Sequence, residues 1–346
     1  MQSIKLGGTA SSISVGRVAV SSFIFSSWTP SPVSDQQAFE AIKAGVDALP
    51  DGVKMFLNSG EFYDNNWGTG NLKLLSRFFA NYPAYAEKTF LSVKGGMSAS
   101  GPDGSLEGLR RSVDNIQDEL GSIKKLDLFE PARIDPKLPV ETTMKNLVTL
   151  LKEGKFSHIG LSECNANMLR KAHSIYPVTA AEIENQKAVI ATATELNISV
   201  LAYSPLGQGF LTGQIKSLAD IPEDDMRAKY DRFKEENFNK NLAIVNRLKA
   251  IAMEKKVTAA QLCIAWVASL GPTMIPLPGS SKATRTLENL NAGDIQLTQE
   301  EKKAVEEVIL VNQLRANGNS KKRRLRHYAC DYVMAQAKVV RGLEVF

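Results

Sequence analysis

Eight short apolar runs recur along the chain, and they alternate with longer amphipathic stretches. Most of the runs are rich in Val, Ile, Leu and Phe and lack a strict alternation of apolar and polar residues, which is typical of strands buried on both faces. Strands that alternate with helices indicate parallel βαβ units. The predicted strands cover residues 18–26, 55–60, 89–96, 127–133, 158–163, 179–184, 199–205 and 273–279.

The amphipathic stretches carry local signals for helix ends. Ser34 is a suitable N-cap for the first stretch, and Gly154 is a stop signal after the third. The predicted helices cover residues 35–48, 103–120, 140–153, 166–174, 186–196, 240–255, 258–270 and 282–290. An open doubly wound sheet is the competing architecture, but eight strands with polar residues at their ends favour a closed barrel. We therefore predict an α/β fold, a single-domain (β/α)8 TIM barrel over residues 1–314.

The distribution of charge separates the body of the chain from its C-terminus. Residues 315–346 hold eight of the 42 Lys and Arg and two of the 37 Asp and Glu, so the other residues carry 34 basic and 35 acidic groups. A balanced body does not suggest a nucleic-acid surface. We predict that 315–346 is a poorly ordered basic tail, and its Lys321–Arg326 cluster leaves nuclear import or anion binding open. The segment 220–239 is charged and predicts a surface excursion.

The three cysteines are widely spaced and form no CxxC pattern, which argues against a disulfide framework or a zinc site. The three histidines offer no metal-ligand spacing either, and we predict no metal. The sequence shows no N-terminal signal segment and no apolar run of the ~18–20 residues needed to span a membrane. These features predict a reducing intracellular compartment, cytoplasmic with the nucleus as an alternative, and no membrane partner.

Tyr63 and Lys94 lie at the ends of two neighbouring predicted strands, and the active site of a barrel gathers at such C-terminal ends. A free phenol has a pKa near ~10, and a nearby ammonium group favours the phenolate and lowers this pKa. Such a tyrosine can donate a proton to a carbonyl oxygen as hydride arrives at the carbonyl carbon. The alternative interpretation is a rim tyrosine beside a snorkelling lysine.

A second polar segment, 278–282, lies at the last predicted strand-to-helix turn. Its glycine and serines let backbone N–H groups approach an anion at a helix N-terminus, and Lys282 and Arg285 add positive charge for a phosphate. The alternative is an ordinary Gly-Ser turn followed by a solvated basic helix face.

Several motifs together resemble the aldo-keto reductases, and most closely their fungal pyridoxal reductase branch. The resemblance covers roughly residues 5 to 312. The Asp-Leu-Phe-Glu-Pro-Ala-Arg-Ile-Asp-Pro segment at 127–136 is the most telling of them. The other matching segments are 58–63 (Asn-Ser-Gly-Glu-Phe-Tyr), 91–96 (Leu-Ser-Val-Lys-Gly-Gly), 158–163, 202–213 and 275–289.

The resemblance implies an NADPH-dependent reduction of a small-molecule aldehyde to an alcohol, with pyridoxal reduced to pyridoxine. It implies that Tyr63 is the proton donor and that Lys94 tunes it, with Asn58 and Arg133 as catalytic neighbours. The cofactor, NADPH or NADP+, would be bound without a Rossmann fingerprint. The implied cofactor-binding residues are Ser162 and Glu163 at the nicotinamide carboxamide, Ser204, Leu206 and Gly207 over the pyrophosphate, Ser280, Ser281, Lys282 and Arg285 at the 2′-phosphate, and Glu288 and Asn289 at the adenine. Glu182 is a further implied cofactor-binding residue.

The chain departs from the usual pattern of that family in four features, of which the tail from about Leu314 is one. Asn58 replaces the usual aspartate, and Ala132 and Arg133 stand where the fourth strand usually carries a histidine. Arg133 polarising the carbonyl oxygen is a hypothesis for the missing histidine. Relatives also have about ten residues after the position of Glu184 that flank the nicotinamide, whereas this chain continues directly into a predicted helix. A general aldehyde reductase and an NADP(H)-binding, catalytically weak barrel therefore stay open as alternatives.

Overall fold

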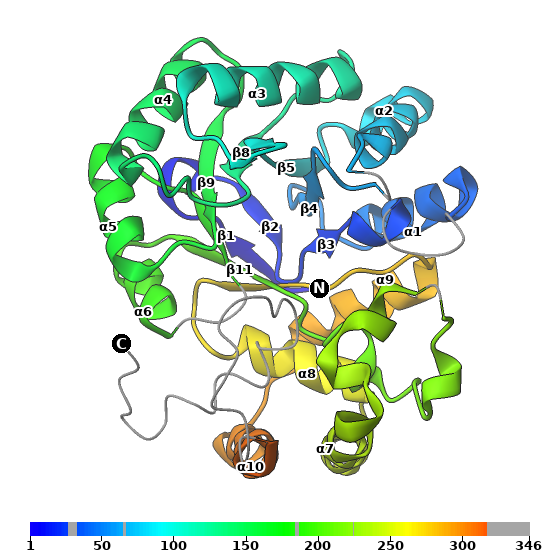
Figure 1. Ribbon diagram of the computed structural model, residues 1–346. Helices are drawn as coiled ribbons and strands as arrows, with labels where there is room; N and C mark the ends of the chain where they lie inside the picture. The colour runs from blue at the N-terminus through cyan, green and yellow to red at the C-terminus, as the bar shows by residue number, and fades with distance from the viewer. Residues whose placement is uncertain (27–32, 65–66, 184–186, 224, 317–346) are drawn as a thin grey trace.

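Eight parallel strands form one sheet in the computed structural model, which describes residues 1–26, 33–64, 67–183, 187–223 and 225–316. Ser21 at one edge of this sheet pairs with Gly279, and Ser21 N donates to Pro278 O at 3.0 Å, so the edges meet. The helices form a ring around the strands (Figure 1). The predicted single-domain (β/α)8 barrel is confirmed. In spatial order the strands are β12 (Met274–Leu277), β11 (Ser199–Tyr203), β10 (Ala180–Ile183), β9 (His158–Ser162), β8 (Leu128–Pro131), β5 (Thr89–Gly95), β4 (Met55–Gly60) and β3 (Val20–Ser21).

Each predicted helix is present with shifted ends. Ser34 accepts a hydrogen bond from Gln37 N, as an N-cap does. The α-helices are α1 (Asp35–Asp47), α2 (Gly70–Asn81), α3 (Leu106–Leu120), α4 (Val140–Lys152), α5 (Ala166–Ile175), α6 (Lys187–Glu195), α7 (Glu235–Glu254), α8 (Ala259–Ala268), α9 (Ala283–Asn291) and α10 (Gln299–Ala316). The 3-10 helices are Gly8–Ala10, Phe23–Phe25, Pro83–Tyr85, Phe210–Thr212, Leu218–Asp220, Met226–Lys229, Asp231–Phe233 and Ala292–Asp294.

Several elements were not predicted from the sequence. They are α2, α10, the hairpin of β1 (Ser3–Lys5) and β2 (Ser14–Gly16), and the hairpin of β6 (Met97–Ser98) and β7 (Gly101–Pro102). Helix α10 extends to Ala316, and the rest of the predicted basic tail, including 321–326, lies outside the described residues, so the tail stays a prediction. Among the described residues, none of the helices combines the length and the apolar character that crossing a membrane requires.

The prediction of a surface excursion over 220–239 is partly wrong. Ile221, Phe233 and Phe238 are buried, and the rings of Phe233 and Phe238 contact Phe210 edge-on, with centroid distances of 5.3 and 5.4 Å. The sequence did not reveal this packing, because the three buried apolar residues are separated by charged residues and follow neither a helix nor a strand period. The segment therefore packs onto the barrel, and its buried Asp225 forms an ion pair with Arg227.

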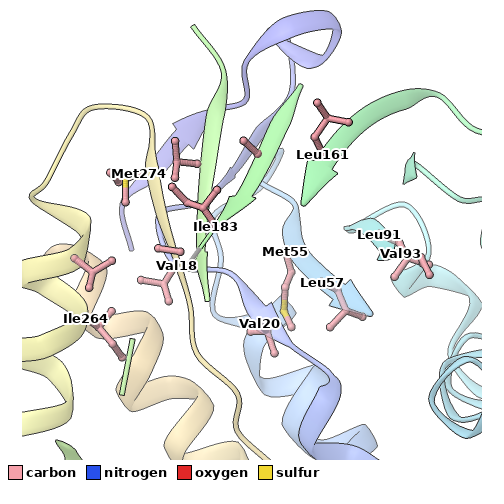
Figure 2. Packing of buried hydrophobic residues seen from close by; sticks show 14 of the residues in the cluster. Val18, Val20, Met55, Leu57, Leu91, Val93, Leu161, Ile183, Ile264 and Met274 are labelled. Carbon is pink, nitrogen blue, oxygen red and sulfur yellow. The ribbon is translucent and has the colours of Figure 1, made fainter. Parts of the chain in front are cut away.

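The apolar core of the barrel has two parts. One part lies between the strands and the helices, and Figure 2 shows some of its members, including Leu57, Val93, Leu161 and Ile183. The other part lies inside the barrel, because successive residues of a strand point to opposite faces. Its members come from the barrel strands and from the N-terminal segment with the β1–β2 hairpin. They are Leu6, Ala10, Val15, Ala19, Phe56, Phe90, Leu128, Ala180, Leu201, Ile275 and Leu277.

The interior changes character two to four residues further along the same strands. Asn58, Ser92, Lys94, Glu130 and Glu182 replace the apolar side chains, and all five are buried. Strand register places Asn58 beside Ser92 and Lys94 beside Glu130. These residues lie at the C-terminal ends of the strands, where a barrel carries its active site.

Candidate active site

Lys94 is the centre of the buried polar cluster. Its Nζ donates to Asn58 Oδ1 at 3.1 Å and forms an ion pair with Glu182 Oε1. Asn58 Nδ2 in turn donates to Glu182 Oε2 at 2.8 Å. Glu182 thus supplies the carboxylate that neutralises Lys94, which the amide of Asn58 cannot do. The resemblance had assigned Glu182 to the cofactor, and the structure joins it to Lys94.

Tyr63 lies beside this cluster, in the turn that follows β4. Its side chain is 8% exposed, and Lys94 Nζ lies 5.2 Å from the centroid of its ring. Phe23 and Phe62 pack edge-on against the ring, with centroid distances of 4.7 and 5.6 Å. A Cβ at Gly60 would lie 2.8 Å from two ring carbons, so this position needs glycine to let the ring lie against the strand. The structure therefore brings together the tyrosine and the lysine that the sequence had paired.

The backbone of Tyr63 is anchored by residues that sequence reasoning missed. Ser26 Oγ donates to Tyr63 O at 2.8 Å, and Asn71 N donates to the same oxygen at 3.2 Å. The buried side chain of Asn71 also accepts hydrogen bonds from Ser22 and Ser59. No motif marks Asn71, because its role depends on contacts between the first and second βα loops. These bonds fix the direction from which Tyr63 approaches Lys94.

The pKa of Tyr63 moves opposite to the direction expected from the sequence. Burial disfavours the phenolate and raises the pKa of Tyr63 to about 12, although the ammonium group of Lys94 acts to lower it. The carboxylates of Glu182 and Glu130 add to the increase. The expectation failed because it counted Lys94 and left out both burial and the two carboxylates. Tyr63 therefore keeps its proton through the neutral range, as a proton donor must.

Lys94 stays charged despite its burial. Burial acts to lower the pKa of Lys94, but the attraction of Glu182, with smaller contributions from Tyr63 and Glu130, raises it above its usual value. The cation is therefore present when negative charge develops on the oxygen of Tyr63.

Arg133 lies directly after β8 and is half-buried. Its Nη1 donates to Ala132 O at 2.5 Å, which turns the guanidinium back toward the end of its own strand. Its role in polarising a carbonyl stays a prediction. Two strands further around the barrel, β10 ends at Ile183 and α6 begins at Lys187, so only residues 184–186, which lie outside the described residues, join them.

The predicted nicotinamide and pyrophosphate residues lie at the ends of β9 and β11. Ser162 is buried, and Glu163 Oε1 accepts a hydrogen bond from the hydroxyl of Tyr203 at 3.1 Å. Glu163 and Ser204 both have a φ of 54°, and Gly207 has a φ of 55°. Left-handed backbone at non-glycine residues costs about 1–3 kcal/mol each and clusters at functional sites. Leu206 packs on the outer core and Gly207 N donates to Ser204 O at 3.0 Å, so the loop is held in this conformation.

The predicted phosphate residues lie around the start of α9. Lys282 is the N-cap of α9 and makes no side-chain cap bond, so the first turn keeps N–H groups for an anion. Ser280 is buried and its Oγ donates to Lys282 O at 2.9 Å. Arg285 donates to Gln214 Oε1 at 2.7 Å, which joins α9 to the loop after β11. The donor set fits a phosphate group.

The remaining three predicted residues make contacts within the protein. Ser281 O accepts from Gln37 Nε2 at 2.8 Å, and Glu288 Oε1 accepts from Thr258 Oγ1 at 2.7 Å, while Asn289 is buried in α9. Glu288 thus fastens α9 to the start of α8. Over the described part of the chain, no group of three or more His, Cys, Asp or Glu side chains is placed to hold a metal ion.

The closed parallel barrel, with a buried tyrosine and lysine at its C-terminal end, defines an oxidoreductase that acts on a carbonyl or an alcohol. Residues 24–310 match the model of the Aldo/keto reductase family, so the chain belongs to this family. Members of the family use a nicotinamide cofactor, and the protein is an oxidoreductase of this kind.

Two fungal proteins are similar to this chain over most of its length, and a solved structure shares its fold. The chain is 35% identical to "Probable pyridoxal reductase 2" of Schizosaccharomyces pombe over 303 residues, which are 83% of this chain and 90% of the relative. It is 34% identical to the "Putative pyridoxal reductase" of Saccharomyces cerevisiae over 310 residues, 80% of this chain and 88% of the relative. A glycerol dehydrogenase from Gluconobacter oxydans has the same fold, with a TM-score of 0.77 and 22% identity over 94% of this chain and 99% of that one.

Proposed function

We propose that the protein reduces an aldehyde to an alcohol with NADPH, and that pyridoxal is its main substrate and pyridoxine its product. The observation that carries the proposal is the protonated Tyr63 held beside the buried Lys94–Glu182 ion pair. The similarity to two fungal proteins described as pyridoxal reductases supports the substrate, and similarity to an S. pombe aldo-keto reductase whose name includes NADP(+) supports the cofactor.

The residues of the cluster divide the proton chemistry among them. NADPH, when bound, would supply the hydride for the carbonyl carbon. Tyr63 donates its hydroxyl proton to the carbonyl oxygen, which becomes the alcohol. Lys94 stabilises the negative charge left on the oxygen of Tyr63, and Glu182 and Asn58 hold Lys94 in place. One proton from solvent restores Tyr63, so aldehyde, NADPH and a proton give alcohol and NADP+.

The residues proposed to hold the cofactor come from three strand ends. Ser162 and Glu163 would contact the nicotinamide end, and the loop with Ser204, Leu206 and Gly207 would cover the pyrophosphate. Ser280, Ser281, Lys282 and Arg285 would hold the 2′-phosphate, which makes the site selective for NADPH over NADH, and Glu288 and Asn289 would flank the adenine. The support is the uncapped start of α9 together with the two basic side chains.

An aromatic surface near Tyr63 supports a planar substrate. Trp67 is 68% exposed and lies in the same loop, with its ring 5.7 Å from that of Phe62 and tilted by 36°. Phe62 in turn contacts Tyr63. A flat heteroaromatic ring can stack on such a surface, which an aliphatic aldehyde cannot do. This surface favours pyridoxal over small aliphatic aldehydes.

The test is to incubate the purified protein with NADPH or NADH and with pyridoxal or an aliphatic aldehyde of similar size. We expect pyridoxine as the product, and a kcat/KM higher with NADPH and with pyridoxal. Equal kcat/KM for both aldehydes would make the protein a general aldehyde reductase. A third outcome is that the protein binds NADPH and reduces no aldehyde. The short connection between β10 and α6 is the feature that supports this alternative, a catalytically weak barrel.

A further inference from the structure

Glu130 is a fully buried carboxyl group that the proposed chemistry does not use. It lies on β8, inside the barrel, in register with Lys94 on β5. Its Oε1 accepts hydrogen bonds from Ser92 Oγ at 2.9 Å and from Asn58 Nδ2 at 3.2 Å. Its Oε2 is buried and has no hydrogen-bond partner among the described residues. One oxygen of this carboxyl is thus satisfied and the other is not.

The neighbouring strand leaves room for this carboxyl group. A Cβ at Gly160 on β9 would lie 3.2 Å from both Cβ and Oε2 of Glu130 and 2.7 Å from Leu128 Cδ2. Any larger residue at position 160 would therefore press on the Glu130 side chain. The absence of a side chain at Gly160 thus makes room for the carboxyl group of Glu130, although Oε2 of Glu130 gains no hydrogen bond there.

Four titratable groups from the surrounding elements act on or lie beside Glu130. They are Lys94 on β5, Glu182 on β10, Tyr63 after β4, and Cys164 after β9. Glu130 and Glu182 share the amide of Asn58 and the field of one ammonium group, but Glu182 alone forms the ion pair with Lys94. A buried carboxylate without a paired cation and with an unbonded oxygen costs more than the neutral acid, because ionisation adds the cost of burying a charge. The geometry therefore disfavours the ionised form of Glu130.

We infer that Glu130 is a positioning residue that must stay protonated for reduction, and that its ionisation switches off proton donation by Tyr63. With Glu130 neutral, the cluster contains one cation and one anion and can accept the charge that develops on Tyr63. With Glu130 ionised, two carboxylates face one ammonium group, and a third negative charge on Tyr63 is disfavoured. The inference rests on the proposed reduction through Tyr63.

The direction of the shifts agrees with this geometry. Burial, and next the charge of Glu182, raise the pKa of Glu130 to about 8, against a smaller opposite effect of Lys94. Glu130 is also one of the groups that raise the pKa of Tyr63. The switch therefore operates on the alkaline side of neutrality.

The experiment is the pH dependence of a single turnover of NADPH and pyridoxal in the wild type and in Glu130→Gln. Glutamine keeps the size and an acceptor oxygen but cannot ionise. In the wild type we expect the rate to fall by about tenfold between about pH 7 and about pH 9, and in Glu130→Gln we expect this fall to be lost. Glu61→Gln is the matched control, because Glu61 is also a buried carboxyl but is bonded to Ser112 and Asn115 of α3; the fall should persist there.

A second measurement reads the proton without turnover. Infrared spectra at about pH 6 and about pH 10 should show a carboxylic acid C=O band that is lost at the higher pH and absent from Glu130→Gln. The same alkaline fall in Glu130→Gln as in the wild type, or no such band in the wild type, would overturn the inference. Failure of the proposed function looks different: no aldehyde is reduced at any pH, while the infrared band still reports the proton on Glu130.

Discussion

The lower and upper halves of the barrel interior are built from the same strands and have opposite chemistry. Phe56, Phe90 and Leu128 fill the lower half, and two residues later Asn58, Ser92 and Glu130 stand in the upper half. The side chains of both halves are buried, but the lower half is covered by the N-terminal hairpin and the upper half is held by hydrogen bonds. The comparison teaches that the apolar layer provides stability, and that the polar layer provides reactivity at some expense of stability.

The largest effect on turnover among the paired tests below should come from removing the cation of the upper half. Lys94→Met leaves no described cation within the cluster, so we expect the single-turnover rate of pyridoxal reduction to fall by about 100-fold or more. The matched control is Lys124→Met. Lys124 is equally buried and lies near the other end of β5, where it donates to Thr89 O at 2.8 Å and pairs with Asp127. A similar loss of rate per folded molecule in both variants would contradict the claim that the polar layer alone carries the reactivity.

The apolar half should respond in stability rather than in rate. Phe90→Ala removes a ring that is 1% exposed and packs on Phe56 with a centroid distance of 5.2 Å. We expect the free energy of unfolding in urea to fall by about 3–5 kcal/mol, while the rate per folded molecule stays close to that of the wild type. A stable variant that is slow would show that the lower layer also shapes the active site.

The pH dependence of stability should differ between the wild type and Glu130→Gln. Because the pKa of Glu130 is raised from 4.5 to about 8 on folding, the folded state holds a proton that the unfolded state loses between these values. The contribution of Glu130 to stability is therefore complete below pH 4.5 and is lost as the pH rises toward 8, by about 1 kcal/mol per pH unit. The free energy of unfolding, measured in urea between pH 4.5 and about 8, should fall more steeply with pH in the wild type than in Glu130→Gln. Equal falls in the two proteins would show that Glu130 does not hold the proton.

The smallest effect should come from the rim of the upper half. Trp67→Ala removes an exposed ring, so we expect an increase in KM for pyridoxal of about threefold, no change for an aliphatic aldehyde, and no loss of stability. Met253→Ala is the control, because Met253 is also exposed and lies near the end of α7. An equal increase in KM for both aldehydes would remove stacking as the basis of selectivity.

The sequence predicted the barrel well because buried parallel strands have a plain signal. The strand predicted at 55–60 is β4 to the residue, and the other predicted strands contain the observed ones. The elements it missed lack such signals: β1 and β2 have three residues each, and α2 begins at a glycine without a side-chain cap. Short pieces and uncapped helices are fixed by tertiary packing rather than by local propensity.

The candidate site was predictable where a motif named a residue and not where partners meet across the barrel. Tyr63 and Lys94 were paired from their places at strand ends. The ion pair of Lys94 with Glu182 joins residues 88 positions apart and depends on barrel closure, which no local pattern encodes. The pKa of Tyr63 was missed for the same reason, since burial and the carboxylate of Glu130 become visible only in three dimensions.

The central claim is that Tyr63 delivers the proton while other residues hold the cofactor. Its most direct test is Tyr63→Phe, with NADPH binding followed by cofactor fluorescence and hydride transfer to pyridoxal followed by single-turnover absorbance. We predict that the variant binds NADPH within about twofold of the wild type and loses about 10²–10⁴-fold in the rate of hydride transfer. A Tyr63→Phe enzyme that binds NADPH and reduces pyridoxal at the wild-type rate would contradict the account.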